Sequence, residues 1–344
     1  MNTRLWTGFL MTGLCLALSG CASAVLARRM VQAPNANGAP RMVRDPKMAE
    51  ILKRTYSQEM LVPVGPPGAV LSVAVLEPGD YGMKHELRLM NKPDGSGQAT
   101  YNFNWQFPNP GAPRVSPKAT IVILHGILVS KEYMIHWAIY LAQKGYRTVI
   151  VDLRGHGAST GRFVTFGAVE RTDMRQVLDE LSRRGLVAGP VGVLGVSYGA
   201  AVGLDWAAID PRVRSVVALE PFSDPRRAIV QFTRGYMPEQ VKGITDDQFA
   251  SAEDQAAHIA NFRWSDADVL RAVQGLRVPV LFYHGRDDTW IPPEHSVRLM
   301  AAAPAGSLLT ILPDDNHMTL SVRLDPIAQQ VATWFDAHLQ ARAR

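Results

Sequence analysis

A serine between two glycines is the first feature of this 344-residue sequence that suggests chemistry. Residues 195–199 read Gly-Val-Ser-Tyr-Gly, a G-x-S-x-G pentapeptide. An apolar run at Val191–Leu194 precedes it, and small residues that can open a helix at Ala200–Ala208 follow it. A turn this tight leaves no room for side chains beside the serine and lifts its hydroxyl clear of the sheet. The pattern predicts that Ser197 is a nucleophile. The alternative is a structural Gly-Ser turn.

A serine hydroxyl is a poor nucleophile until a base takes its proton, and that base is normally a histidine oriented by a carboxylate. His317 follows an apolar run at Leu308–Leu312, and the pair Asp287 and Asp288 follows another at Val278–Tyr283. Both places come after Ser197, in the order serine, acid, histidine. Since catalytic groups gather at the carboxyl ends of strands in α/β sheets, we expect these side chains to meet there.

The elements that must position these residues alternate along the chain. Continuous runs of Val, Ile and Leu predict strands buried on both faces, and the intervening amphipathic patterns predict helices. This alternation predicts an α/β fold with a doubly wound, mostly parallel sheet. The expected strands are Thr120–Leu124, Thr148–Val151, Val191–Leu194, Val213–Leu219, Val278–Tyr283 and Leu308–Leu312, and the expected helices are Tyr133–Lys144, Val169–Arg184, Ala200–Ala208, Glu294–Ala303 and Pro326–Leu339.

Three further strands are expected before this region, at Val70–Val75, His85–Met90 and Tyr101–Phe107. Turn residues separate them, which predicts antiparallel N-terminal strands at the opening of the sheet. A short helix is expected at Lys47–Glu59.

Residues 222–277 interrupt the alternation with an interval longer than an ordinary loop. Helical patterns at Asp246–Asn261 and Ser265–Gln274, the second with Ser265 as its N-cap, predict a helical cap. Apolar side chains of the cap could line a substrate pocket or form the cap's own core, which is the commoner case. They are Ile229, Phe232, Tyr236, Met237, Phe249, Phe262 and Trp264.

Four blocks between Thr120 and Leu339 together resemble the α/β-hydrolase superfamily, and are most similar to its serine-esterase and monoacylglycerol-lipase-like branch. They are His125-Gly126, the D-x-R-G-H-G-x-S turn at 152–159, the pentapeptide at 195–199 and the G-x-x-D-x-x-[VI]-P block at 285–292. The resemblance implies that Asp288 is the acid of the triad and that Asp287 is a solvated or turn-capping carboxylate. One departure is Asn316, where the family usually has glycine before the histidine.

The resemblance also implies an oxyanion hole made by the backbone N–H groups of Ile127 and Tyr198. We expect the Tyr198 phenol to pack rather than to react, and Asp152, Arg154 and Glu170 to make structural bonds. Glu220, at a strand end near the cap, would touch substrate or act as a hinge. The other eight histidines are expected to be structural or to lie outside the site: His85, His125, His136, His156, His258, His284, His295 and His338.

The N-terminus resembles a bacterial lipoprotein signal. Arg4 precedes an apolar run that is too short for a comfortable membrane span and that ends in Leu18-Ser19-Gly20-Cys21. This resemblance implies a signal peptide at residues 1–20 and lipid anchoring through Cys21. With no Asp directly after Cys21, we expect the outer membrane, facing the periplasm of a Gram-negative bacterium. The alternative is an ordinary secretory signal that contains a cysteine.

The expected organisation after the signal is a lipid-anchored tether with a short helix at residues 21–64 and the hydrolase domain at 65–344. Residues 22–45 are rich in Ala, Pro, Asn and Gly, a composition typical of a flexible tether. The net charge of +5 is spread along the chain rather than clustered, which argues against nucleic-acid binding.

Both cysteines, Cys15 and Cys21, lie near the N-terminus, which excludes disulfides, Cys-ligated zinc and thiol catalysis downstream. The sequence holds no nucleotide, flavin or metal motif, so we expect no cofactor and no metal.

The predicted activity is hydrolysis of a small-molecule carboxylic ester with an apolar acyl or aromatic group. The alternatives are a peptidase or amidase of the same fold and a non-catalytic envelope binding lipoprotein.

Overall fold

A computed structural model describes residues 19–36, 46–91, 97–107 and 115–339 of the chain. Most of the predicted signal peptide, residues 1–18, lies outside the described residues. Within the described part, no helix has both the length and the apolar character needed to cross a membrane.

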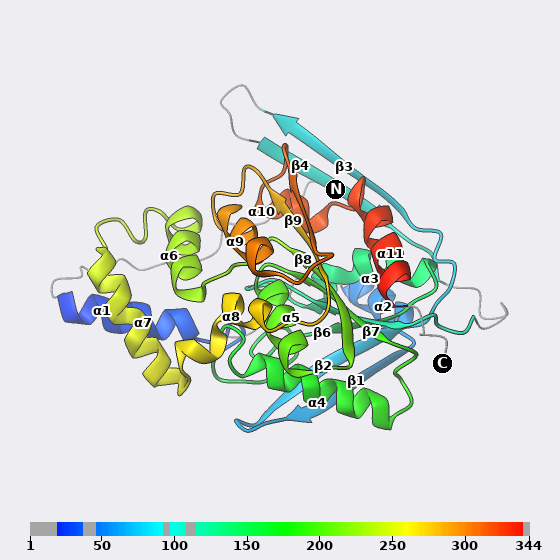
Figure 1. Ribbon diagram of the computed structural model, residues 1–344, viewed down its shortest axis with the longest axis horizontal. Coiled ribbons are helices and arrows are strands. Elements are labelled where there is room, and N and C mark those ends of the chain that lie inside the picture. Colours follow the sequence, from blue (N-terminus) through cyan, green and yellow to red (C-terminus); the bar gives the residue numbers. More distant parts are fainter. Residues whose placement is uncertain (1–18, 37–45, 92–96, 108–114, 340–344) are drawn as a thin grey trace.

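An eight-stranded sheet forms the centre of the molecule (Figure 1). Its strand order is β1-β2-β6-β5-β7-β8-β9-β10, and every pair from β6 to β10 is parallel. This arrangement confirms the predicted α/β class with its mostly parallel sheet. The strands are β1 (Gln58–Val64), β2 (Ala69–Leu76), β5 (Thr120–Leu124), β6 (Arg147–Val151), β7 (Val191–Val196), β8 (Val213–Leu219), β9 (Val280–Gly285) and β10 (Leu308–Leu312).

Helices cover both faces of the sheet, because its central strands are apolar on both sides. Two hydrophobic clusters result, one on each face. The first packs against α4 and α5, and the second against α3 and α11. Besides an N-terminal helix described below, the helices outside the cap are α2 (Pro46–Thr55), α3 (Ile135–Gln143), α4 (Glu170–Arg183), α5 (Tyr198–Ile209), α9 (Glu294–Ala302), α10 (His317–Val322) and α11 (Ile327–His338), with a 3-10 turn η1 (Lys131–Met134) before α3.

The N-terminal strands differ from the prediction. β3 (Lys84–Asn91) and β4 (Gly97–Asn104) form a separate two-stranded sheet, and the antiparallel opening of the main sheet is β1 paired with β2. The helix expected at Lys47–Glu59 ends at Thr55 as α2, and the strand after it was missed. Pro63 obscured that strand in the sequence, yet β1 is the edge of the sheet, where a missing N–H is tolerated.

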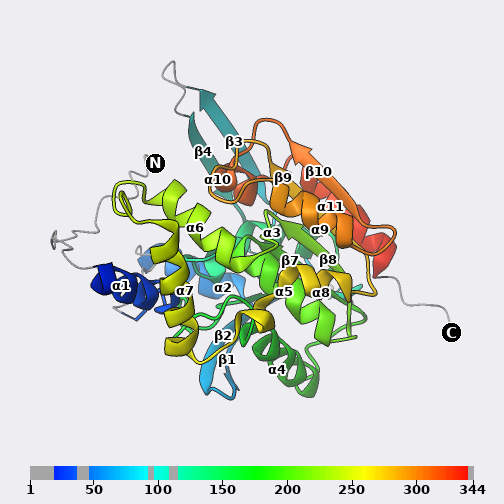
Figure 2. The same cartoon turned by 60° about the vertical axis from the view of Figure 1, so that its left-hand side comes forward.

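The interval at residues 222–277 is helical, and it contains α6 (Pro225–Tyr236), α7 (Asp246–Ala260), the 3-10 turn η2 (Trp264–Ala267) and α8 (Val269–Gln274). Side-chain caps begin its α-helices: Asp224 caps α6, and Thr245 forms a capping box with Gln248 at α7. The N-cap of α8 is Asp268 rather than the predicted Ser265. Helices α6 and α7 lie to one side of the sheet (Figures 1 and 2).

The prediction of a flexible tether is wrong for residues 22–36. Ser19–Val31 form a helix, α1, that runs beside α7 in both views (Figures 1 and 2). Ser23, Ala27 and Val31 are buried at i, i+4 and i+8, and the Ser23 hydroxyl donates to the Gln248 carbonyl oxygen of α7 at 3.2 Å. Small residues on this face let the two helices approach closely. The Pro- and Asn-rich composition that suggested a tether therefore does not extend to this helix.

The chain after α1 is also bonded to the domain. The Val164 N–H donates to the Val31 carbonyl oxygen, and the Ala33 N–H donates to that of Arg162. The Asn35 amide donates to the Ser159 carbonyl oxygen at 2.6 Å. The N-terminal segment is thus part of the folded domain, which also includes β1, and the domain does not begin at residue 65.

Candidate active site

Ser197 lies between β7 and α5 in a strained backbone conformation. Its φ of 51° and ψ of −114° are unusual for a residue with a side chain. A Cβ on Gly199 would lie 2.5 Å from the His125 and Leu124 carbonyl oxygens, and one on Gly195 would lie 2.6 Å from the Ala200 Cα. Both flanking positions therefore require glycine, as the pentapeptide predicts.

The structure brings the three predicted side chains together from three strand ends. The His317 Nε2 lies 2.9 Å from the Ser197 Oγ, and its Nδ1 lies 2.6 Å from the Asp288 Oδ2. All three residues are less than a tenth exposed. A proton has a continuous hydrogen-bonded path from the serine to the histidine, and the carboxylate selects the ring tautomer with its proton on Nδ1.

Asp288 is held rigidly as an anion. Its Oδ1 accepts the N–H groups of Trp290 and Ile291 at 3.0 and 2.8 Å, and the His284 Nε2 lies 3.2 Å from its Oδ2. Burial alone would raise the pKa of this carboxyl, but His317, and to a smaller extent His284, lower it to about 2. The neighbouring Asp287 is exposed and does not take part in the triad. This agrees with the 285–292 block, in which Asp288 rather than Asp287 occupies the position of the acid.

His317 is the first residue of α10, and Asn316 caps that helix. The Asn316 side chain accepts the N–H groups of Met318 and Thr319, while the Thr319 hydroxyl accepts the Asn316 N–H at 2.9 Å. This capping box fixes the turn that carries the imidazole. The residue that departs from the family's usual glycine therefore has a structural use.

The loop after β5 passes directly beside the serine. A Cβ on Gly126 would lie 3.7 Å from the Ser197 Cβ, and both Ile127 and Tyr198 line the same cavity as Ser197. Among the described residues, no acceptor is bonded to the N–H of Ile127 or of Tyr198. Two backbone donors beside the nucleophile are what a developing oxyanion needs, and the first-turn N–H groups of α5 add a favourable field.

His125 holds this loop in place. Its Nε2 accepts the Leu153 N–H at 3.0 Å, so its Nδ1 carries the proton and donates to the Gly126 carbonyl oxygen at 2.7 Å. Burial lowers the pKa of His125 to about 4, which keeps the ring neutral. The neutral ring therefore links the loop after β5 to the loop after β6 through two hydrogen bonds.

The polar residues of the 152–159 turn make structural bonds, as expected. Asp152 accepts the Lys131 N–H at 2.7 Å and lies 3.1 Å from the Lys131 Nζ, and Arg154 forms a buried pair with Asp173 at 2.7 Å. The Tyr198 ring is buried and packs edge-on against Phe166, consistent with the packing role expected for it.

Glu220 is fully buried behind the triad. One of its carboxyl oxygens lies 3.8 Å from the His317 Nδ1, and neither oxygen has a hydrogen-bond partner in the described part of the chain. It is not among the residues that line the cavity, so of the two roles considered for it, substrate contact has no support here. Glu220, Asp288 and His317 place donor atoms within 4.8 Å of one another. Both nitrogens of His317 are already hydrogen-bonded within the triad, so the geometry argues against a metal ion at this cluster.

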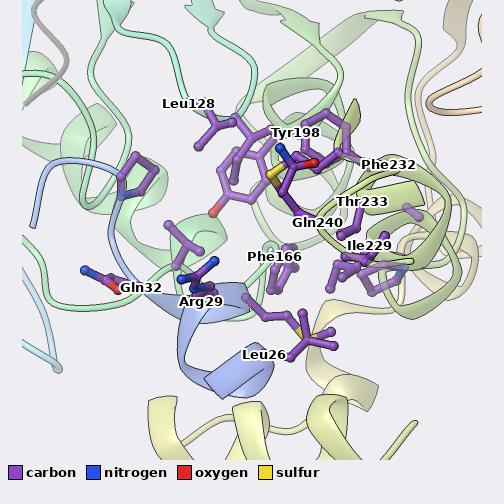
Figure 3. A pocket seen from close by; sticks show the side chains of 18 of the residues that line it. Leu26, Arg29, Gln32, Leu128, Phe166, Tyr198, Ile229, Phe232, Thr233 and Gln240 are labelled. Atoms are coloured by element: carbon purple, nitrogen blue, oxygen red, sulfur yellow. The ribbon is translucent and has the colours of Figure 1, made fainter. Parts of the chain in front are cut away.

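A cavity of about 340 Å³ opens above Ser197, within the size range of small-molecule sites. Its lining is mostly apolar and comes from three directions: the loop after β5, the cap helix α6 and the N-terminal helix α1 (Figure 3). Of the seven apolar cap residues singled out from the sequence, Ile229, Phe232 and Met237 line the cavity. Tyr236, Phe249, Phe262 and Trp264 pack elsewhere in the cap.

Sequence reasoning missed two contributions to the site. Lys131, which supports the loop after β5, is a lysine only 2% exposed, and nothing in its local sequence indicates burial. The α1 wall did leave a signal, because its cavity-lining residues Ala22, Val25, Leu26, Arg29 and Met30 recur at helical spacing.

Comparisons with known proteins agree with this architecture. A family model described as the alpha/beta hydrolase family matches residues 121–333. An uncharacterized protein of Bacillus subtilis is 25% identical over 210 residues, which cover 60% of this chain and 67% of that protein. The 2-hydroxy-6-oxo-6-(2'-aminophenyl)hexa-2,4-dienoic acid hydrolase of Metapseudomonas resinovorans is 25% identical over 213 residues, covering 52% of this chain and 71% of that enzyme.

Among solved structures, an esterase of Pyrococcus furiosus has a TM-score of 0.60 at 18% identity, and the match covers 88% of this chain and 99% of that esterase. A thermophilic esterase of Thermogutta terrifontis has a TM-score of 0.53 at 15% identity, and the match covers 83% of this chain and 100% of that esterase. At these identities the likeness shows the shared fold. Because the family model spans more than half of the sequence, the chain belongs to the alpha/beta hydrolase family.

Proposed function

We propose that the protein is a serine hydrolase that cleaves a carboxylic ester through an acyl-enzyme on Ser197. The observation that carries the proposal is the hydrogen-bonded path from the Ser197 Oγ through both His317 nitrogens to Asp288, with distances of 2.9 and 2.6 Å. Its Ser197 end lines a mostly apolar cavity. A serine, a base and an orienting acid in this geometry are the arrangement that acyl transfer uses.

In the proposed mechanism the Ser197 Oγ attacks the ester carbonyl carbon while the His317 Nε2 takes the hydroxyl proton. The Asp288 carboxylate accepts a hydrogen bond from the His317 Nδ1–H and so stabilises the imidazolium that forms. The carbonyl oxygen becomes an oxyanion, and the N–H groups of Ile127 and Tyr198 donate to it. When the tetrahedral intermediate collapses, the C–O bond of the ester breaks and the His317 proton passes to the leaving alcohol.

Water completes the cycle. It attacks the acyl carbon, His317 takes one of its protons, and the second intermediate collapses to release the carboxylic acid and return the proton to the Ser197 oxygen. The substrate we propose is a small-molecule ester with an apolar acyl or aromatic group, because the cavity beside Ser197 is lined mainly by apolar side chains.

Two alternatives from the sequence have less support. A peptidase would need polar groups to hold a peptide terminus, and Glu220, the candidate for this, is buried away from the cavity. A non-catalytic binding lipoprotein would not need a hydrogen-bonded triad with a strained serine.

The test is hydrolysis of p-nitrophenyl esters by the full chain, with Ser197→Ala as the control. We expect turnover that falls by at least about a thousandfold in the variant, and fluorophosphonate labelling that requires Ser197. Absence of both turnover and labelling in the unmutated chain would sink the proposal.

We also propose that Cys21 is acylated and anchors the protein to the outer membrane of a bacterium with two membranes. The support is the lipobox-like sequence that ends at Cys21. Mass spectrometry of the chain purified from bacterial membranes should find an N-terminal Cys21 carrying acyl groups. An unmodified Cys21 would contradict the anchor.

A further inference from the structure

The N-terminal helix α1 presents two distinct faces. One face, made of Ser23, Ala27 and Val31, is buried along α7. The other lies against the cavity above Ser197 and contains Ala22 and Leu26, with Met30 one turn further along. In Figure 3, Leu26 and Arg29 on this helix lie across the cavity from Leu128 and from Tyr198, the residue that directly follows Ser197.

The position of α1 is fixed rather than incidental. At its end the Val31 carbonyl oxygen accepts the Val164 N–H, and Val164 itself lines the cavity. A Cβ on Gly155 would lie 2.6 Å from the Ala33 Cβ, so the strand-end turn and the segment after α1 are in close contact. Because α1 is hydrogen-bonded at its end and packed along α7, its side chains hold a defined position beside the cavity.

We propose that α1 is a specificity-determining wall of the substrate site, and that it contacts the distal part of a long, apolar acyl chain whose ester carbonyl lies at Ser197. This inference rests on the proposed function and adds the element that selects the acyl chain. Leu26 and Met30 provide apolar contact with the chain, and such contact scales with the area removed from water. A short acyl group bound at Ser197 does not reach this wall.

The wall also adjoins the predicted anchor. Ala22, which lines the cavity, directly follows Cys21 in the chain. The lipid anchor proposed for Cys21 and the acyl wall therefore belong to the same helix. The substrate class assigned by this arrangement is an ester with a long hydrocarbon chain rather than a small water-soluble ester.

Tryptophan substitutions on two faces of α1 test the inference in the full chain. Leu26→Trp and Met30→Trp add bulk inside the cavity, whereas Arg28→Trp adds the same bulk at an exposed position that does not line it. For the two cavity variants we expect the ratio of kcat/KM on long-chain p-nitrophenyl esters to kcat/KM on the acetate ester to fall by about tenfold or more. Arg28→Trp should keep the unmutated profile for all chain lengths. Equal losses on acetate and long-chain esters, or an unchanged profile in both cavity variants, would overturn the inference.

Hydrogen exchange separates this inference from the proposed function. The full chain is labelled at Ser197 with alkyl fluorophosphonates that carry a short or a long alkyl chain. Only the long chain should slow amide exchange in residues 22–34, because only it reaches α1. Labelling without this difference would refute the role of α1 alone, whereas failure of Ser197 to label would refute the proposed function.

Discussion

The floor and the roof of the cavity are held by different forces. The floor consists of the loops that follow β5, β6, β7, β9 and β10, and directional polar contacts order it. Lys131 illustrates this, since its Nζ lies 3.1 Å from the Asp152 carboxylate and 2.9 Å from that of Glu132 although the residue is only 2% exposed. Such groups have few alternative arrangements, because each bond lost inside the protein leaves a buried polar atom unsatisfied.

The roof consists of α1 and α6, with α7 packed against α1, and apolar contacts hold most of it. Phe232 and Tyr236 of α6 stack on each other, and both meet the Trp290 ring edge-on, with centroids 5.8 and 5.0 Å away. Trp290 in turn lies 5.6 Å from the His317 ring, so this aromatic group joins roof and floor. Apolar contact has no preferred direction and tolerates changes of shape. The difference suggests that the floor sets the reaction and the roof sets the substrate.

The largest expected effect comes from the floor. In Asp288→Asn, the amide cannot hold His317 in the tautomer that takes the serine proton, so we expect kcat on p-nitrophenyl acetate to fall by about 10⁴-fold. The loss should be the same for all acyl lengths, because the change lies outside the roof. Steady-state kinetics across the ester series would measure it.

Asp287→Asn is the matched control, since the same chemical change is made one residue away on an exposed side chain. It should leave kcat within about twofold of the unmutated value. Equal losses in the two variants would show that the loop as a whole, rather than the Asp288 carboxylate, matters for activity.

The second effect is the pH dependence of the protein's free energy of unfolding, to which Glu220 behind the triad contributes. Burial, and then the charges of Asp288 and Asp315, raise the pKa of Glu220 well above its ordinary range. The folded protein therefore keeps the Glu220 proton that the unfolded chain loses above about pH 4.3, and stability from this group falls as the pH rises from there to the folded pKa. In Glu220→Gln this loss is absent. For each unit by which the pH rises through this range, the free energy of unfolding of the variant should therefore increase by about 1.4 kcal/mol relative to that of the unmutated protein.

Urea unfolding of both proteins at several values between pH 5 and 8 would measure this gain. Taking the difference between the two proteins cancels the other titrating groups, including Asp288, whose lowered pKa stabilises the fold above about pH 4. Parallel stability curves would mean that Glu220 is already ionised in the folded protein.

The smallest effect is expected in the roof. Phe232→Ala removes a half-buried ring that lines the cavity and that contacts Tyr236 and Trp290. We expect KM for long-chain esters to rise a few-fold, about 1 kcal/mol of binding, with kcat on acetate nearly unchanged. A large fall in kcat on acetate would instead show that α6 positions the triad, and the contrast between floor and roof would fail.

Much of the floor was predictable because its determinants are local. The glycines beside Ser197, the strand before each loop and the order serine, acid, histidine all appear in the linear sequence. The choice of Asp288 over Asp287 needed only a count along one motif. The roof was less predictable, since an apolar residue such as Phe249 or Phe232 has the same local signature whether it fills the cap's core or lines a cavity.

By itself the sequence determined the fold class, the parallel strands from β5 to β10 and the candidate catalytic residues, because periodicity and tight-turn chemistry are properties of neighbouring residues. Tertiary structure decided what depends on contacts between distant segments. These are the burial of Lys131 and Glu220, the separation of β3 and β4 from the main sheet, and above all the packing of α1 against α7. The free energy of that packing comes from area buried between segments more than two hundred residues apart, which no local pattern encodes.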